Sequence, residues 1–232
     1  MNAPAAHRWS EGGAVFFAVS GVGPELAAAA ARVLMDYEQD GSQWRRRYPA
    51  DAPHLDQAWP SFAAHIGQVL RQAARLEPVF WREALRELCR RTFDQSVDWW
   101  LTGSAALAVR GAAIEPGDLD LVCGGVDALR LGDLFADALL EPVVPAAENW
   151  VSDWWGRAYW GARIEWIGGA RPFVDDPEPS DFGPAAGRRL ETVSFEDWQV
   201  RVPPLDLQRA VSARRGLTDR VALIDALIAG TA

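Results

Sequence analysis

The stretch WWLTGSAALAVRGAAIEPGDLDLVC, from Trp99 to Cys123, decides what fold is expected. Its first four residues and the segment DLDLVC both have the apolar character of β-strands, and a glycine follows each of them. The alanine-rich segment between them predicts a short helix that ends at Gly111. The stretch therefore predicts a strand–helix–strand unit in which a glycine-serine pair opens the helix.

Two aspartates, Asp118 and Asp120, lie one residue apart in the second strand. Residues i and i+2 of a strand project from the same face, with Cα atoms roughly 6.6 Å apart. Carboxylates this close repel each other and destabilise the fold unless a cation lies between them, and Mg²⁺ is a common choice in proteins. The alternative is that Asp118 is a turn residue and Asp120 a solvated edge position.

The pair Gly103 and Ser104 lies where the first strand passes into the helix. Backbone N–H groups are unpaired at the start of a helix and favour anions there. Gly103 lets a ligand approach the backbone closely, and the hydroxyl of Ser104 adds a donor. The alternative is a serine that caps a helix after a turn glycine. Together with the paired aspartates, however, the pair predicts a phosphate site beside a metal site.

Composition excludes several other classes of protein. The net charge of −9 over 232 residues disfavours a general nucleic-acid partner. All 23 basic residues are arginine, so a phosphate-loop lysine, a Schiff-base lysine and a lysine nucleophile are excluded. Cys89 and Cys123 lie in apolar runs without metal-ligand spacing, which predicts reduced thiols in a cytoplasmic protein. No apolar run reaches the roughly 18 residues of a membrane span.

The remainder of the chain predicts an α+β protein. Residues 1–95 are expected to be mainly helical, with a strand at 14–19, a long loop at 38–60 and an unknown role. Residues 96–232 are expected to form a domain with a mixed β-sheet that helices cover on one face. Strands are expected at 189–195 and 198–203, and two helices at 204–214 and 218–228.

The pair GS followed after 13 residues by DLDL resembles the signature of the polymerase-β-type nucleotidyltransferase superfamily. The segment LTGSAALAVRG…PGDLDLV is especially similar to the small bacterial antibiotic nucleotidyltransferases of the aminoglycoside and lincosamide types. The resemblance covers about residues 97–228, whereas residues 1–95 resemble no family that we can name. It implies a nucleotidyltransferase-like fold for residues 96–232.

The resemblance also implies roles for particular residues. Gly103 and Ser104 would contact the nucleotide phosphates, and Asp118 and Asp120 would bind one or two Mg²⁺ ions. The family uses a third carboxylate on a neighbouring strand, and Glu165 in GARIEWIGG is our choice for it. The remaining candidates are three other acids and, for a phosphate contact, two arginines: Glu148, Asp153 and Glu191; Arg110 and Arg163.

The function implied is Mg²⁺-dependent transfer of a nucleoside monophosphate from a nucleoside triphosphate such as ATP to a hydroxyl of a small molecule. Pyrophosphate would leave, and the enzyme would act in the bacterial cytoplasm without a membrane or nucleic-acid partner. One alternative is a toxin-like nucleotidyltransferase that acts on protein or tRNA. Another is a non-catalytic domain that binds nucleotide and regulates a partner.

Overall fold

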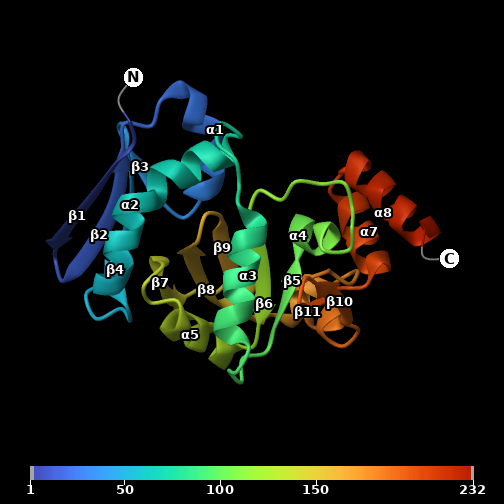
Figure 1. Ribbon diagram of the computed structural model, residues 1–232. Coiled ribbons are helices and arrows are strands. Elements are labelled where there is room, and N and C mark those ends of the chain that lie inside the picture. The colour runs from blue at the N-terminus through green and yellow to red at the C-terminus, as the bar shows by residue number, and fades with distance from the viewer. Residues whose placement is uncertain (1–2, 231–232) are drawn as a thin grey trace.

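A computed structural model describes residues 3–230 of the chain (Figure 1). The N-terminal part is a four-stranded antiparallel sheet in the order β1–β2–β4–β3, seen at the left of the figure. A short helical segment connects the strands that are second and third along the chain. The elements are β1 (Ala5–Glu11), β2 (Ala14–Ser20), η1 (Pro24–Leu26), α1 (Ala27–Val33), β3 (Glu38–Asp40) and β4 (Gln43–Pro49).

The prediction of a long loop over residues 38–60 is wrong, because this segment holds β3, β4 and the start of α2 (Leu55–Ala73). Three consecutive arginines resemble a solvated run in the sequence. In the structure they alternate between the faces of β4, which pairs with β2 and buries Tyr48. The strand at 14–19 is confirmed as β2, and helices still make up much of residues 1–95.

The central sheet has five strands in the order β5–β6–β9–β8–β7. Strands β6 and β9 pair in parallel, and the other neighbours are antiparallel. The strands are β5 (Trp99–Thr102), β6 (Leu119–Cys123), β7 (Leu139–Pro145), β8 (Ser152–Tyr159) and β9 (Arg163–Ala170). Helix α4 (Gly103–Ala108) follows β5 directly, so the predicted strand–helix–strand unit is confirmed.

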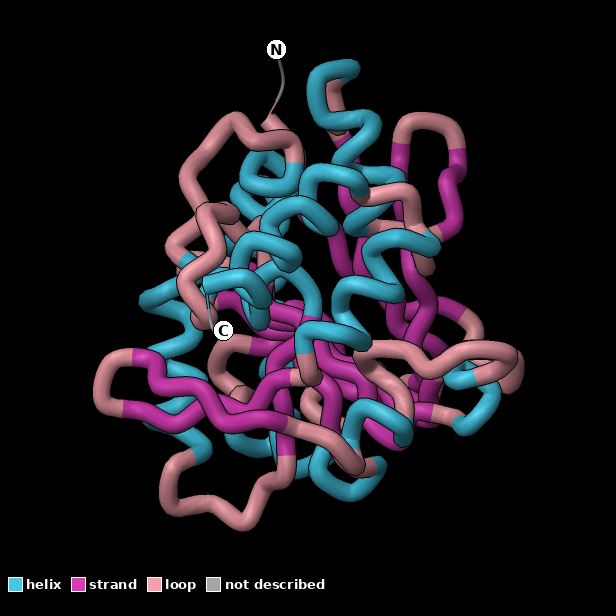
Figure 2. Tube along the Cα trace, turned by 90° about the vertical axis from the view of Figure 1, so that its right-hand side faces the viewer, coloured by secondary structure: helices cyan, strands magenta, loops and turns pink. Residues whose placement is uncertain are grey.

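Helices cover one face of the central sheet, as the sequence predicts. Leu119, Ile164 and Trp166 project toward α3 (Trp81–Thr92) and α5 (Gly125–Leu134) and are almost fully buried. The indole nitrogen of Trp166 donates to the carbonyl of Ala128 in α5 at 3.1 Å. Seen from the side of the C-terminal helices, strands gather in the middle of the molecule and helices surround them (Figure 2).

The last 60 residues confirm the expected order of two strands and two helices. The elements are η2 (Pro172–Asp175), α6 (Pro184–Gly187), β10 (Glu191–Phe195), β11 (Trp198–Val202), α7 (Leu205–Arg214) and α8 (Thr218–Gly230). Strands β10 and β11 form a separate hairpin. Within residues 3–230, no helix is both long and apolar enough to cross a membrane.

One hydrophobic core runs through both halves of the molecule. It includes Phe17 of β2, Phe62 of α2 and Leu139 of β7, each of them fully buried. Helix α2 packs against both β1 and β7. The N-terminal sheet is thus joined to the central sheet through shared packing and is not a detached module.

Candidate active site

A row of polar residues crosses the central sheet from one edge to the other. The strand register pairs Glu141 with Arg157, Arg157 with Glu165, Glu165 with Asp120, and Asp120 with Thr102. Paired residues on adjacent strands project from the same face, so these five side chains lie side by side. We call them the polar row. It lies on the face opposite the one that α3 and α5 cover.

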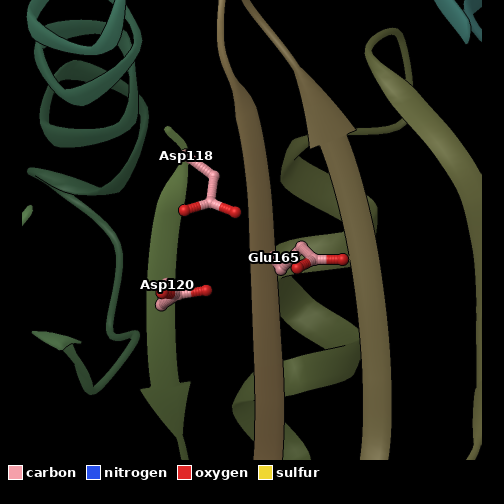
Figure 3. A group of neighbouring side chains, drawn as sticks. All are labelled: Asp118, Asp120 and Glu165. Carbon is pink, nitrogen blue, oxygen red and sulfur yellow. The ribbon is translucent and has the colours of Figure 1, made fainter. Parts of the chain in front are cut away.

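The three carboxylates predicted as metal ligands come together where β6 lies beside β9 in the middle of the sheet (Figure 3). Asp118 immediately precedes β6, Asp120 lies in β6, and Glu165 lies in β9. One oxygen of each lies within 4.8 Å of the others. The parallel pairing of β6 with β9 produces this cluster, because it sets Glu165 directly beside Asp120.

Two arginines bind the cluster from one side. Arg163 donates to Asp118 and, at 3.2 Å, to Oε1 of Glu165. The Nε–H of Arg157 donates to the same Oε1 atom. Among the described residues, no hydrogen bond reaches Oε2 of Glu165 or either oxygen of Asp120. Free carboxylate oxygens therefore remain for a cation.

The electrostatic environments of Asp120 and Glu165 differ. Burial, followed by the negative charges of Asp118 and Glu165, raises the pKa of Asp120 well above its ordinary value. Burial also raises the pKa of Glu165, but the guanidiniums of Arg157 and Arg163 outweigh it and lower that pKa. A divalent cation would relieve the repulsion at Asp120, and hard carboxylate oxygens suit Mg²⁺. The donor set therefore fits the expected metal.

A cavity of about 400 Å³ opens onto Asp120 and Glu165. Trp150 and Trp155 contribute a stacked aromatic wall, with ring centroids 5.7 Å apart and planes at 14°. Met35 reaches the cavity from the N-terminal part of the chain. The C-terminal part of the chain adds Asp181, Phe182, Val211 and Arg215 to the lining.

Gly103 lies at the corner between β5 and α4 and also lines this cavity. Its φ of +65° is in the left-handed region that favours glycine. A Cβ atom at this position would lie 2.6 Å from Oδ2 of Asp120. Gly103 thus lies close to the carboxylate cluster, and half-buried Ser104 follows in the first turn of α4.

The arginines proposed for phosphate contact lie in different places. Arg163 lies within the carboxylate cluster, whereas Arg110 pairs with Glu191 and donates to the carbonyl of Pro203 at 2.9 Å. Arg110 therefore faces the C-terminal hairpin rather than the cavity.

Of the alternative third acids, Asp153 pairs with Arg171 at 3.0 Å and is largely exposed. Sequence reasoning did not find Asp181 and Arg215, because both follow the motif by more than 55 residues without a signature of their own.

Acid is expected to destabilise the polar row through Glu141. Burial raises the pKa of Glu141, but Arg157, Arg46 and a hydrogen bond from Tyr48 lower it to about 2. A folded-state pKa below the unfolded one gives stability that is complete above about pH 4.5 and is lost as the pH falls toward 2. We expect a loss of about 2–3 kcal/mol from this group alone.

Urea unfolding of the wild type and Glu141→Gln at several pH values measures this contribution. The difference in unfolding free energy should be largest near pH 7 and should shrink toward pH 2.5. Parallel curves for the two proteins across this range would contradict the assignment.

Three solved structures resemble the chain, each at low identity. A Thermotoga maritima protein proposed to be a nucleotidyltransferase is 19% identical over 63% of this chain and 91% of its own, with a TM-score of 0.49. The lincosamide antibiotic adenylyltransferase LnuA, solved with lincomycin, is 11% identical over 65% of this chain and 99% of its own, with a TM-score of 0.46. ANT(2")-Ia, solved with adenylyl-2"-tobramycin, is 12% identical over 65% of this chain and 98% of its own, with a TM-score of 0.36. No protein family and no curated protein matches the sequence.

Proposed function

We propose that the protein is a Mg²⁺-dependent nucleotidyltransferase that moves a nucleoside monophosphate from a nucleoside triphosphate to a hydroxyl of a small molecule. One observation carries the proposal: Asp120 and Glu165, two of three carboxylates that could share a cation, open onto the same cavity as Gly103. The resemblance of the motif to nucleotidyltransferases supports the same assignment.

The residues of the site would have three roles: metal binding, phosphate binding and proton transfer. Asp118, Asp120 and Glu165 would hold one or two Mg²⁺ ions, which in such sites neutralise phosphate charge and polarise the phosphorus under attack. Gly103 and Ser104 would bind the phosphates through backbone N–H groups and the serine hydroxyl. Glu165 or Asp120 would accept the proton of the acceptor hydroxyl as its oxygen bonds to the α-phosphorus. The bond from that phosphorus to the bridging oxygen would break, and pyrophosphate would leave.

The shape and charge of the cavity favour small substrates. Its volume of about 400 Å³ is in the range of small-molecule sites. The Trp150–Trp155 wall offers a flat apolar surface on which a nucleobase or a ring of the acceptor can stack. The net charge of −9 disfavours tRNA as acceptor.

Arg215 is expected to contribute to nucleotide binding. It follows α7 and lines the same cavity as Asp120 and Glu165, where a guanidinium can bind phosphate oxygens. Arg215→Ala should weaken binding of a non-hydrolysable nucleotide with Mg²⁺ about tenfold, as measured by isothermal titration calorimetry. Arg214→Ala is the matched control, because Arg214 pairs with Glu178 instead. Equal affinities for the two variants would exclude Arg215 as a phosphate contact.

The proposed function is tested by incubating the protein with Mg²⁺ and α-labelled nucleoside triphosphates over a panel of hydroxyl acceptors. Label transfer with release of pyrophosphate supports it. Nucleotide binding without transfer to any acceptor would favour the non-catalytic alternative. Absence of a thermal shift with both Mg²⁺ and nucleotide would contradict both.

A further inference from the structure

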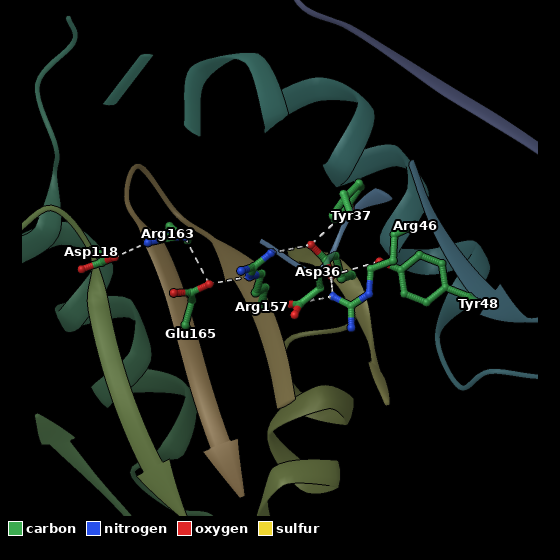
Figure 4. A network of polar contacts seen from close by, with 9 residues as sticks. Asp36, Tyr37, Arg46, Tyr48, Asp118, Arg157, Arg163 and Glu165 are labelled. Carbon is green, nitrogen blue, oxygen red and sulfur yellow. Dashed lines mark hydrogen bonds and ion pairs between the residues drawn. The ribbon is translucent and has the colours of Figure 1, made fainter. Parts of the chain in front are cut away.

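The polar row extends beyond the carboxylate cluster into the buried interior (Figure 4). Arg157 donates to Glu165 through Nε and, at 2.9 Å, to Glu141 through Nη1. Only 2% of Arg157 and 3% of Glu141 is exposed. The guanidinium of Arg157 also stacks on Trp155, 4.3 Å from the ring centroid. Arg157 is thus held on two sides and connects Glu165 to Glu141.

The N-terminal sheet binds the far end of the row. Tyr48 of β4 and Tyr37, which precedes β3, donate hydroxyl hydrogen bonds to Glu141 at 3.0 and 3.2 Å. Arg46 of β4 donates to it as well and lies 3.6 Å from Asp36. Charges therefore alternate from the cluster to the N-terminal sheet, through Glu165, Arg157, Glu141, Arg46 and Asp36.

Stability alone does not explain such a buried series of alternating charges. Burying charges costs several kcal/mol per ion, and apolar residues of similar volume often serve as well or better. The adjacent positions on these strands, such as Ala158 and Ile164, are apolar and fully buried on the other face. The charged residues of the row therefore all lie on the face that carries the carboxylate cluster.

We propose that Arg157 and Glu141 are positioning residues through which the N-terminal sheet holds Glu165 in place for the metal. The sheet fixes Glu141, Glu141 fixes Arg157, and Arg157 occupies one oxygen of Glu165 while the other stays free. Residues 5–49 would thus help to position Glu165, although Met35 is the only one of them that lines the cavity. The inference rests on the proposed function, because it assumes that Glu165 binds a metal.

Two substitutions should change metal affinity in opposite directions. In Glu141→Gln, Arg157 loses its second anion and binds Glu165 more strongly, so less of the Glu165 charge is available to the metal and Mn²⁺ affinity should fall about tenfold. In Arg46→Met, Glu141 loses one of its two arginines and attracts Arg157 more strongly. Arg157 then binds Glu165 less strongly, so Mn²⁺ affinity should rise about threefold. General damage to the fold would lower the affinity in both variants.

The experiment measures Mn²⁺ binding to full-length protein at pH 7.5 by electron paramagnetic resonance, with folding checked by circular dichroism. Glu87→Gln is the matched control for Glu141→Gln. Glu87 also binds two arginines, Arg90 and Arg91, and has a pKa lowered to about 2, but it lies on α3 outside the row. Arg91→Met is the control for Arg46→Met, because Arg91 also pairs with acids and stacks on a tryptophan.

Weaker binding in Glu141→Gln with wild-type affinity in Glu87→Gln supports the inference. Wild-type affinity in a folded Glu141→Gln protein overturns it. If Glu141→Gln does not fold, Arg46→Met decides alone, since an unchanged or lower affinity there overturns the inference too. A wild-type protein that binds no Mn²⁺, with or without nucleotide, would instead overturn the proposed function.

Discussion

Asp120→Asn is expected to stop metal-dependent transfer and, without metal, to make the folded protein more stable. Asp120 is the one carboxylate of the cluster to which neither Arg157 nor Arg163 donates. Burial and the charges of Asp118 and Glu165 raise its pKa well above the ordinary value. Its ionised form therefore destabilises the folded state at every pH above its unfolded pKa of about 3.9.

Asparagine has nearly the same shape without the charge. We expect the free energy of unfolding of the variant to be about 1 kcal/mol higher, which raises the melting temperature of a chain of this length by about 2–4 °C. Removing one of the three proposed metal ligands should lower the transfer rate about 10³-fold, equivalent to about 4 kcal/mol. A residue that costs stability and is required for activity is typical of an active site.

Thermal unfolding without metal and label transfer with Mg²⁺ measure the two effects. Mg²⁺ should also raise the melting temperature of the wild type more than that of the variant. Asp153→Asn is a suitable control, because Asp153 is a largely exposed acid that pairs with Arg171 outside the cluster. A variant that retains wild-type transfer would remove Asp120 from the site.

Gly103→Ala is expected to damage both the fold and the site. Alanine in a left-handed conformation costs about 1 kcal/mol. In addition, the new Cβ would lie 2.6 Å from Oδ2 of Asp120, so the carboxylate must move. We expect a total loss of about 1–2 kcal/mol of stability and at least a ~100-fold lower transfer rate, because the displaced Asp120 no longer faces Glu165.

Gly41→Ala separates the two causes. Gly41 has a φ of +59°, and a Cβ there would meet nothing within 4 Å. It should lose a similar amount of stability from backbone strain and keep wild-type transfer and Mn²⁺ affinity. Urea unfolding and label transfer on both variants measure the difference. If Gly103→Ala kept full activity, the contact between Gly103 and Asp120 would have no role in the reaction.

The parts of the site that could be predicted are those in which neighbouring residues determine the geometry. Alternation along a strand places Asp118 and Asp120 on one face, and a glycine between a strand and a helix predicts the corner at Gly103. The identity of the third acid depends instead on a register between strands that are more than 40 residues apart. The resemblance and its place in a strand favour Glu165, and the pairing of β6 with β9 brings it beside Asp120.

The arginines show the limit of local reasoning. Arg110 follows the motif helix directly, yet its guanidinium pairs with Glu191 of the C-terminal hairpin. Arg215 has no local signal and reaches the cavity because of where α7 packs. The run Arg45–Arg47 resembles a solvated surface in the sequence, and Arg46 nevertheless lies on buried Glu141.

The sequence by itself determined the α+β class, the strand–helix–strand unit and the closeness of Asp118 to Asp120, because short-range periodicity and chain geometry control these features. Only the tertiary structure decided that Glu165 completes the cluster and that Arg157 and Glu141 connect it to the N-terminal sheet. These contacts depend on strand order and register, which bring together residues that lie tens of positions apart in the sequence.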